Sequence, residues 1–174
     1  MKIDKVVVGS LEENCYVVSI DDECLVIDPG SEFEKIKQEI GNKKVIGVLI
    51  THHHFDHVGA LEEVLKEYNT ELYDYNNLEE KEYNIGPFKF EVIFNPGHSI
   101  DSVSYYFKEN RIMFVGDFVF LGSIGRCDLE GGSFDEMKKS VDKLTRFSED
   151  ITLYPGHGMK TTLGYEKRSN SYFW

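Results

Sequence analysis

One segment constrains the fold of this chain more than any other: THHHFDH, residues 51–57. It follows KKVIGVLI at 43–50, an apolar run rich in β-branched residues, which predicts a strand that enters the core. Four of the six histidines in the chain, together with an aspartate, therefore stand where a buried strand ends. Side chains of this kind need partners when they are buried, so the segment indicates a bound group.

The spacing within this segment predicts which side chains act together. In extended backbone alternate side chains share a face, so His52, His54 and Asp56 point one way and His53 points the other. His57 can turn toward a neighbouring point as a helix begins. Imidazole nitrogens and carboxylate oxygens are ligands for zinc, iron or manganese. The segment therefore supplies parts of two metal positions.

The same arrangement recurs later in the chain. An apolar strand again ends in a turn rich in glycine or proline that carries a potential ligand, in VIFNPGHS, MFVGDF and ITLYPGHG. These turns add His98, Asp117 and His157. Every histidine of the chain thus lies in one of the four segments. A set of this kind indicates a metal site built from several strand ends.

The rest of the chain reads as short strands interrupted by a few helices, which predicts sheets covered by helices. Helices are expected at 31–42, from about 58 to 69, and at 133–147, because apolar residues recur there at helical spacing. Ser31 with Glu34, and Ser133 with Glu136, predict capping boxes at two helix starts. Short β-rich segments fill the rest of the chain. No linker or short-period repeat separates them, so we expect one domain over residues 1–174.

Composition limits the partners and the compartment. The 174 residues include 41% hydrophobic and 29% charged residues, with a formal net charge of −12, so nucleic-acid binding is not expected. No apolar run approaches the roughly 20 residues that span a bilayer. The number of cysteines is odd, so they do not indicate a disulfide framework; they are Cys15, Cys24 and Cys127. We expect thiols in a reducing cytoplasm, a small-molecule substrate and no membrane partner. The oligomeric state stays open.

These motifs together resemble the metallo-β-lactamase superfamily, with its H-x-H-x-D-H pattern. VIDPG at 26–30, THHHFDH, NPGHS, GD and PGHG follow one another in the family's order across nearly the whole chain. Within the superfamily the chain looks most like small glyoxalase II-like hydrolases, which also carry a segment similar to GRCDL at 125–129. The resemblance implies a four-layer αββα sandwich with a binuclear metal site at one edge of the sheets.

The resemblance also implies roles for individual residues. Two divalent cations are expected, with zinc first and iron or manganese as alternatives. The first would be held by His52, His54 and His98, the second by Asp56, His57 and His157, and Asp117 would bridge both. Asp28 and His53 would support these ligands from behind. For Asp28, the first residue of an Asp-Pro-Gly turn, a purely structural role is an equal alternative.

The chemistry that follows is hydrolysis of a small thioester, such as a 2-hydroxyacyl-glutathione. A hydroxide held by two cations is nucleophilic at neutral pH, and Asp56 could orient it or move its proton. A thiolate leaves without strong acid assistance, which suits a site that lacks an obvious general acid. Arg126 is the predicted contact for a substrate carboxylate. The C-terminal helical domain that binds glutathione in full-length glyoxalase II enzymes has no counterpart in these 174 residues.

Several alternatives stay open at this point. A mononuclear iron persulfide dioxygenase shares the fold but would leave Asp56, His57 and His157 without a ligand role. Another hydrolase of the fold, acting on a lactone or a phosphodiester, would use the same residues. True metallo-β-lactamases commonly lack an aspartate like Asp117, and the oxygen-reducing di-iron branch generally carries glutamate where His54 stands, so both are disfavoured. A purely structural or stored metal ranks last.

Overall fold

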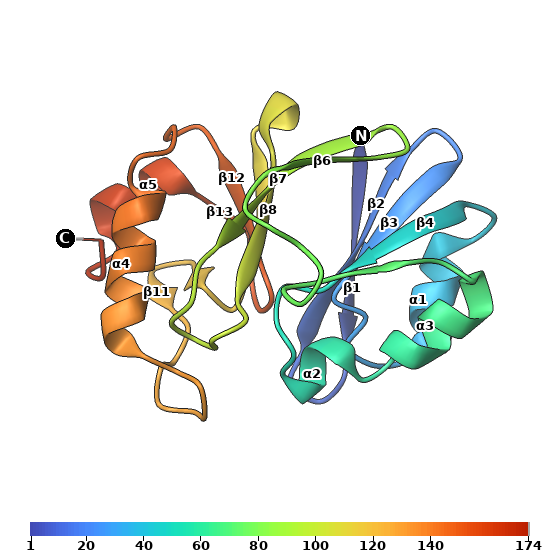
Figure 1. Cartoon of the computed structure of the whole chain (residues 1–174), viewed down its shortest axis with the longest axis horizontal. Coiled ribbons are helices and arrows are strands. Elements are labelled where there is room, and N and C mark those ends of the chain that lie inside the picture. The colour runs from blue at the N-terminus through green and yellow to red at the C-terminus, as the bar shows by residue number, and fades with distance from the viewer. Residues whose placement is uncertain (174) are drawn as a thin grey trace.

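Two β-sheets face each other, and helices cover the outer side of each (Figure 1). The computed structural model describes residues 1–173. In Figure 1 the sheet formed by the blue and cyan strands carries α1, α2 and α3, and the sheet formed by the green-to-red strands carries α4 and α5. The predicted four-layer αββα sandwich is confirmed.

The first sheet has the strand order β1-β2-β3-β4-β5. Its first three strands are antiparallel, and β4 and β5 then add parallel to β3 and to each other. The parallel strands are joined through the helices that cover this sheet, as parallel crossovers require. The strands are β1 Lys2–Val8, β2 Glu13–Ile20, β3 Glu23–Ile27, β4 Lys44–Leu49 and β5 Leu72–Tyr73.

The second sheet has the strand order β13-β12-β9-β8-β7-β6. Its neighbours are antiparallel except for β9 and β12, which run parallel. The carboxyl ends of β9 and β12 therefore meet at one edge of the sheet. Its strands are β6 Glu82–Ile85, β7 Phe88–Phe94, β8 Val103–Phe107, β9 Ile112–Gly116, β12 Thr152–Pro155 and β13 Thr161–Thr162. A separate pair, β10 Val119–Phe120 and β11 Ser123–Ile124, follows β9.

The helices are short and amphipathic. They are α1 Phe33–Ile40, α2 Phe55–Val58, α3 Leu61–Tyr68, α4 Phe134–Leu144 and α5 Leu163–Ser169, with one 3₁₀ turn, η1 Lys108–Asn110. The helix predicted from about 58 to 69 is in fact α2 and α3, separated by Gly59 and Ala60. No helix within residues 1–173 is both long and apolar enough to cross a membrane.

The strands bury both of their faces because the sheets lie between other layers. In β2, Tyr16 and Val18 point into the cluster between the two sheets, whereas Cys15 and Val17 point into the cluster beneath α1 and α3. This alternation explains why β2 reads as a continuous apolar run and not as an alternating one. A third cluster fills the space between the second sheet and α4. Cys15 and Cys24 are buried free thiols, and Cys127 is partly exposed.

The two predicted capping boxes have different outcomes. The Oγ of Ser133 accepts a hydrogen bond from the backbone N–H of Glu136 and caps α4, as predicted. The prediction for Ser31 is wrong. Helix α1 begins one residue later, with Glu32 as its N-cap in the left-handed region (φ 51°), and no side chain caps it. Glu32 instead accepts a hydrogen bond from the backbone N–H of Gly9, a contact that sequence spacing does not show.

The strand ends that carry the predicted ligands meet at one edge of the sandwich. Backbone and side-chain hydrogen bonds join the two sheets there: Val103 N donates to Thr51 O over 2.8 Å, and Tyr105 Oη donates to Ile50 O over 2.6 Å. On the other side of this edge, Asn14 N donates to Gly156 O over 2.7 Å. The loops after β4, β7, β9 and β12 are therefore held next to one another.

Candidate metal centre

The loops after β4 and β7 bring the first group of side chains into place. Three histidines, named here the histidine half, converge there: His52, His54 and His98. Their candidate ligand atoms all lie within 4.8 Å of one another. His98 Nε2 lies 2.8 Å from His54 Nδ1. His52 is 1% exposed, and its Nε2 has no hydrogen-bond partner within the described residues.

A second group lies beside the first and is named here the carboxylate half. It consists of Asp56, His57 and His157, whose candidate ligand atoms are also within 4.8 Å of one another. Asp56 and His57 come from α2, and His157 comes from the turn after β12. His157 Nε2 lies 3.2 Å from Asp56 Oδ2. His57 is completely buried, and its Nε2 likewise has no hydrogen-bond partner among residues 1–173.

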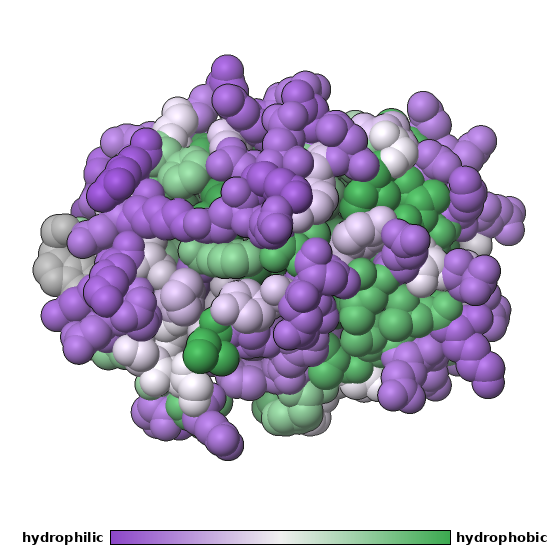
Figure 2. Space-filling view, in the orientation of Figure 1, coloured by the Kyte–Doolittle hydropathy of each residue, from purple (hydrophilic) through white to green (hydrophobic). Residues whose placement is uncertain are grey.

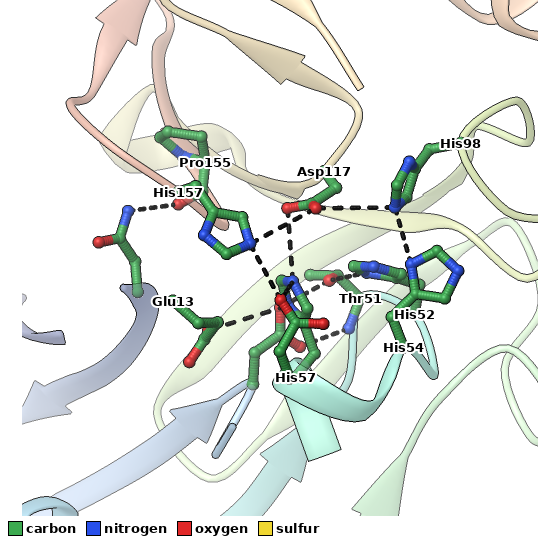
Figure 3. A network of polar contacts seen from close by, with 12 residues as sticks. Glu13, Thr51, His52, His54, His57, His98, Asp117, Pro155 and His157 are labelled. Carbon is green, nitrogen blue, oxygen red and sulfur yellow. Dashed lines mark hydrogen bonds and ion pairs between the residues drawn. The ribbon is translucent and has the colours of Figure 1, made fainter. Parts of the chain in front are cut away.

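Asp117, directly after β9, stands between the two halves (Figure 3). One carboxylate oxygen, Oδ1, lies 3.4 Å from His57 Nε2. The other, Oδ2, lies 3.6 Å from both His98 Nε2 and His157 Nε2. A single carboxylate thus faces nitrogens from both halves, which is the arrangement a bridging ligand requires.

Glycine at position 156 leaves room for this convergence. A Cβ atom built on Gly156 would overlap both Asp117 Oδ1 and His57 Cε1. The glycine of the PGHG segment is therefore needed for space, because its backbone packs directly against two candidate ligands. Gly59 has a similar role behind α2, where a Cβ would overlap the carbonyl oxygen of Gly30. That close approach holds α2 against the VIDPG turn.

The ring nitrogens on the outer side are held by other groups. His98 Nδ1 donates to Arg126 O over 2.7 Å, and His157 Nδ1 donates to Leu11 O over 3.0 Å. His57 Nδ1 donates to Asp28 Oδ2 over 3.0 Å. When Nδ1 carries the proton, the lone pair of Nε2 is free to bind a cation, and such outer contacts also fix the orientation of the ring.

Asp28 joins both halves from behind. Its carboxylate accepts from Thr51 N over 2.7 Å and from Thr51 Oγ1 over 2.6 Å, in addition to the bond from His57. Since the Thr51 hydroxyl donates to Asp28, its oxygen can accept from His52 Nδ1, which lies 3.1 Å away. Asp28 is 2% exposed and has φ of 50°. It therefore orients His57 directly and His52 through Thr51.

The electrostatics of the two halves differ. Burial and the neighbouring histidines lower the pKa of His52 well below its usual value, and burial together with His98 lowers the pKa of His54. Burial acts in the same direction on His57, but its contacts with Asp117 and Asp28 outweigh burial and raise the pKa well above the usual value. In the metal-free protein these environments therefore favour the neutral form of His52 and His54 and the protonated form of His57.

These residues fit a pair of divalent cations. His52 Nε2, His57 Nε2 and Asp117 Oδ1 are buried polar atoms for which the described part of the chain supplies no hydrogen-bond partner. Leaving such atoms unsatisfied costs about 1–3 kcal/mol each. All three belong to clusters whose atoms lie close enough together to share an ion, and each cluster offers nitrogen or oxygen donors. The donor set accordingly suits zinc, iron or manganese.

His53 points away from this cluster, as its place in the alternating pattern predicts. Its ring lies between two carboxylates: Nδ1 is 2.6 Å from Asp101 Oδ2, and Nε2 is 3.0 Å from Asp74 Oδ2. The backbone N–H of His53 also donates to Asp101. His53 therefore ties the loop after β4 to the loop that carries His98.

Arg126 lies at the rim, but its guanidinium is engaged within the chain. Nε donates to Asp128 Oδ1 over 2.7 Å and Nη2 donates to Asp128 Oδ2 over 2.8 Å. The predicted role as a carboxylate-binding residue is thus opposed by a neighbouring carboxylate. The contribution of Arg126 that the structure does show is its backbone carbonyl, which orients His98.

Two residues beside the carboxylate half were not identified from the sequence. Glu13 is 1% exposed, lies 3.8 Å from His57 Nδ1, and has a pKa that burial raises to about 10, although the charge of His57 opposes the rise. Asn14 donates to the carbonyl oxygens of Pro155 and Gly158, both over 3.0 Å, and so braces the turn that carries His157. The sequence signal that could have identified them is the pair Glu13-Asn14, two polar residues at the start of the otherwise largely apolar strand β2.

Comparison with known proteins agrees with this geometry. The model of the Metallo-beta-lactamase superfamily matches residues 8–78 and 71–157. The chain is 35% identical to the probable metallo-hydrolase YqgX of Bacillus subtilis, over 99% of this chain and 97% of that protein. It is 30% identical to the hydroxyacylglutathione hydrolase GloC of Haemophilus influenzae, over 99% of this chain and 98% of that protein.

Two solved structures share this fold over nearly the whole chain. The crystal structure of the BLEG-1 B3 metallo-beta-lactamase superposes with a TM-score of 0.95 and 29% identity, covering 99% of each chain. The structure of TTHA1623 in a di-iron-bound form superposes with a TM-score of 0.88 and 32% identity, covering 97% of this chain and 99% of that chain.

Proposed function

The chain belongs to the metallo-beta-lactamase superfamily, and we propose that it is a binuclear metal-dependent hydrolase of the glyoxalase II type that cleaves small thioesters. The reaction consumes water: the C–S bond breaks, the acyl carbon gains the oxygen of water, and the products are a carboxylate, a thiol and a proton. A 2-hydroxyacyl thioester is the substrate class that we propose.

One observation carries this proposal: Asp117 faces nitrogens of both halves, and three buried atoms of the cluster lack hydrogen-bond partners in the described chain. We propose that the histidine half holds one cation, that the carboxylate half holds the other, and that Asp117 contacts both. When bound, such a pair of cations supplies Lewis acidity and lowers the pKa of water. Zinc is the first expectation, and the di-iron form of TTHA1623 supports iron as the alternative.

The chain's own residues then have distinct tasks. Asp56 is 15% exposed at its side chain, so it can exchange a proton with solvent while it faces the centre of the site. We propose that it orients the attacking water and accepts its proton. Asp28 and the carbonyl groups of Arg126 and Leu11 keep the rings fixed, so that little reorganisation is needed during the reaction.

The thioester assignment is supported by the leaving group and by the relatives. A thiolate leaves without a strong acid, and the carboxylates of Asp28, Asp56 and Asp117 at this site are engaged with histidines. GloC, named a hydroxyacylglutathione hydrolase, is similar over 99% of this chain.

The direct test measures hydrolysis of S-lactoylglutathione and of S-lactoyl-N-acetylcysteamine by protein whose metal content has been quantified. We expect turnover of at least one thioester, and loss of that turnover in Asp56→Ala. Asp142→Ala, which removes an exposed carboxylate on α4, is the matched control and should keep full activity. Protein that holds two metals per chain and hydrolyses neither thioester would overturn the proposal.

Hydrolysis of a β-lactam is the second candidate, favoured by the TM-score of 0.95 to the BLEG-1 B3 metallo-beta-lactamase. A chromogenic cephalosporin in the same assay distinguishes it. Turnover of the cephalosporin with no turnover of thioesters would replace the thioester proposal by this one.

A further inference from the structure

Exposed apolar side chains lie on the segments that carry or contact candidate ligands. Leu11 is 52% exposed, Phe55 is 76% exposed and Ile100 is 69% exposed. Each is next to a candidate ligand: the carbonyl of Leu11 accepts from His157, Phe55 lies between His54 and Asp56 in the chain, and Ile100 follows His98 by two residues. Exposed apolar residues gathered at a functional site mark a surface that binds something apolar.

Leu11 and Phe55 form one lip of the site. They line a pocket of about 220 Å³ whose wall includes the carboxylate-half residue Asp56. The pocket is lined by Val8, Gly9, Ser10, Leu11, Gly30, Ser31, Phe55, Asp56 and Gly59. Figure 2 shows green, hydrophobic side chains at the lower edge of the molecule, where α2 lies. A pocket smaller than the roughly 300–1,000 Å³ of drug-sized ligands suits a short chain.

Ile100 and Leu129 form the opposite lip. Leu129 is 40% exposed and lies in the loop of residues 125–132, which folds over Ile100. A Cβ built on Gly131 would lie 3.6 Å from Ile100 Cγ2, in ordinary van der Waals contact. This lip belongs to the side of the site that carries His98.

The charges on both lips are unfavourable for an anionic substrate. Arg126, the cation of the second lip, is neutralised by its two hydrogen bonds to Asp128. Glu12 is exposed beside Leu11, and Glu130 is exposed beside Leu129. The chain as a whole carries a formal charge of −12. Free carboxylates on a substrate would therefore meet apolar and negatively charged groups.

We infer that the two apolar lips bind the thiol-carrying arm of the substrate, so that the preferred thioester has an uncharged, largely apolar arm and not one with free carboxylates. This inference rests on the proposed thioester hydrolysis and specifies its substrate class. An arm of methylene and amide groups meets this description. The tripeptide glutathione, with two free carboxylates, does not.

The test compares two thioesters that share the lactoyl group and differ in the arm. S-lactoyl-N-acetylcysteamine is uncharged, and S-lactoylglutathione carries the two carboxylates. We expect kcat/KM to be at least about tenfold higher for the uncharged thioester, and Ile100→Ser to lower that value by about tenfold while changing the glutathione value little. Tyr165→Ser, which changes an exposed aromatic residue on α5, is the matched control and should alter neither value.

The outcomes separate the two proposals. Equal or higher kcat/KM for the glutathione thioester would overturn this inference and leave thioester hydrolysis intact. Hydrolysis of neither thioester would overturn both. If light scattering showed a dimer that Phe55→Ser or Ile100→Ser converts to monomer, with no discrimination between the thioesters, the lips would be assigned to a second copy of the chain and this inference would fail.

Discussion

The histidine half and the carboxylate half have the same number of protein side chains but opposite electrostatic environments. Behind His98 stands a neutral carbonyl group, and His52 reaches Asp28 only through the Thr51 hydroxyl. His57, in contrast, contacts the carboxylates of Asp28 and Asp117. The neutral form is therefore favoured for His52 and His54 in one half, and the protonated form is favoured for His57 in the other. Cation binding should therefore be coupled to release of a proton mainly in the carboxylate half.

Removing the residue shared by both halves should have the largest effect. In Asp117→Ala both cations lose a ligand, so we expect metal content to fall in both halves. Activity should fall by more than the roughly 10- to 100-fold typical for loss of a supporting group. Metal analysis after dialysis, together with turnover, measures this. Loss of only one cation with activity retained would show that the halves are independent.

Asp28→Asn should distinguish the halves. An amide has one acceptor oxygen, so it cannot serve both Thr51 N, which donates to Oδ1, and the Thr51 Oγ1 and His57 Nδ1 donors at Oδ2. With the amide NH2 group at the Oδ2 position, His57 loses its orienting contact directly and His52 loses it only through Thr51. We expect cation affinity to fall about 10- to 100-fold in the carboxylate half and less in the histidine half. The metal-free protein should also lose about 1–3 kcal/mol of unfolding free energy. Two-site metal titration and urea unfolding measure these effects, with Asp142→Asn as the control.

The pKa of His57 gives a prediction about pH. Because the contacts with Asp117 and Asp28 outweigh burial and raise this pKa, the protonated form of His57 is favoured in the metal-free protein, and a cation that binds there must displace the proton. We expect about one proton released per chain, and affinity in the carboxylate half that rises with pH, up to tenfold per pH unit. His52 and His54, with lowered pKa values, should release none. Calorimetry in buffers of different ionisation enthalpy counts the protons, and His57→Gln should abolish the release.

The smallest expected effect comes from His53, which lies outside both halves and contacts Asp101. Burial raises the pKa of Asp101, but hydrogen bonds from Ser99 and His53 outweigh burial and lower it. The contact between His53 and Asp101 therefore stabilises the fold at pH values above the pKa that Asp101 has in the unfolded chain. This stabilisation is lost as the pH falls through the lowered pKa of Asp101 in the folded protein. We expect His53→Ala to cost about 1–2 kcal/mol at neutral pH and less in acid. Urea midpoints at both pH values check this. An equal loss at both would show that packing, and not the hydrogen bond to Asp101, is responsible.

Much of the fold and of the site's composition could be predicted from residues close together in the sequence. The alternation in 51–57 placed His53 opposite its neighbours, and the recurring strand-and-turn pattern identified the other strand ends. The structure brings the seven predicted ligands together, with Asp117 between the two halves, and their role as ligands is the proposal made above.

The remaining contacts join residues far apart in the sequence. Asp101 lies 48 positions from His53, and the contact between Glu13 and His57 depends on how β2 packs behind α2. No local pattern encodes such pairs. Glu32, which takes the N-cap position predicted for Ser31, contacts Gly9, 23 positions away. The contact of Arg126 with Asp128 is local, but the residue types alone did not decide between that ion pair and a free cation.

Metal stoichiometry tests the central claim most directly. Mass spectrometric metal analysis of the purified chain and of His157→Ala, both loaded with zinc and then dialysed, gives the number of cations per chain. Two functional halves predict two cations in the parent chain and one in the variant, which keeps the histidine half intact. A single cation in both proteins would contradict the binuclear account and favour a mononuclear site formed by the histidine half with Asp117.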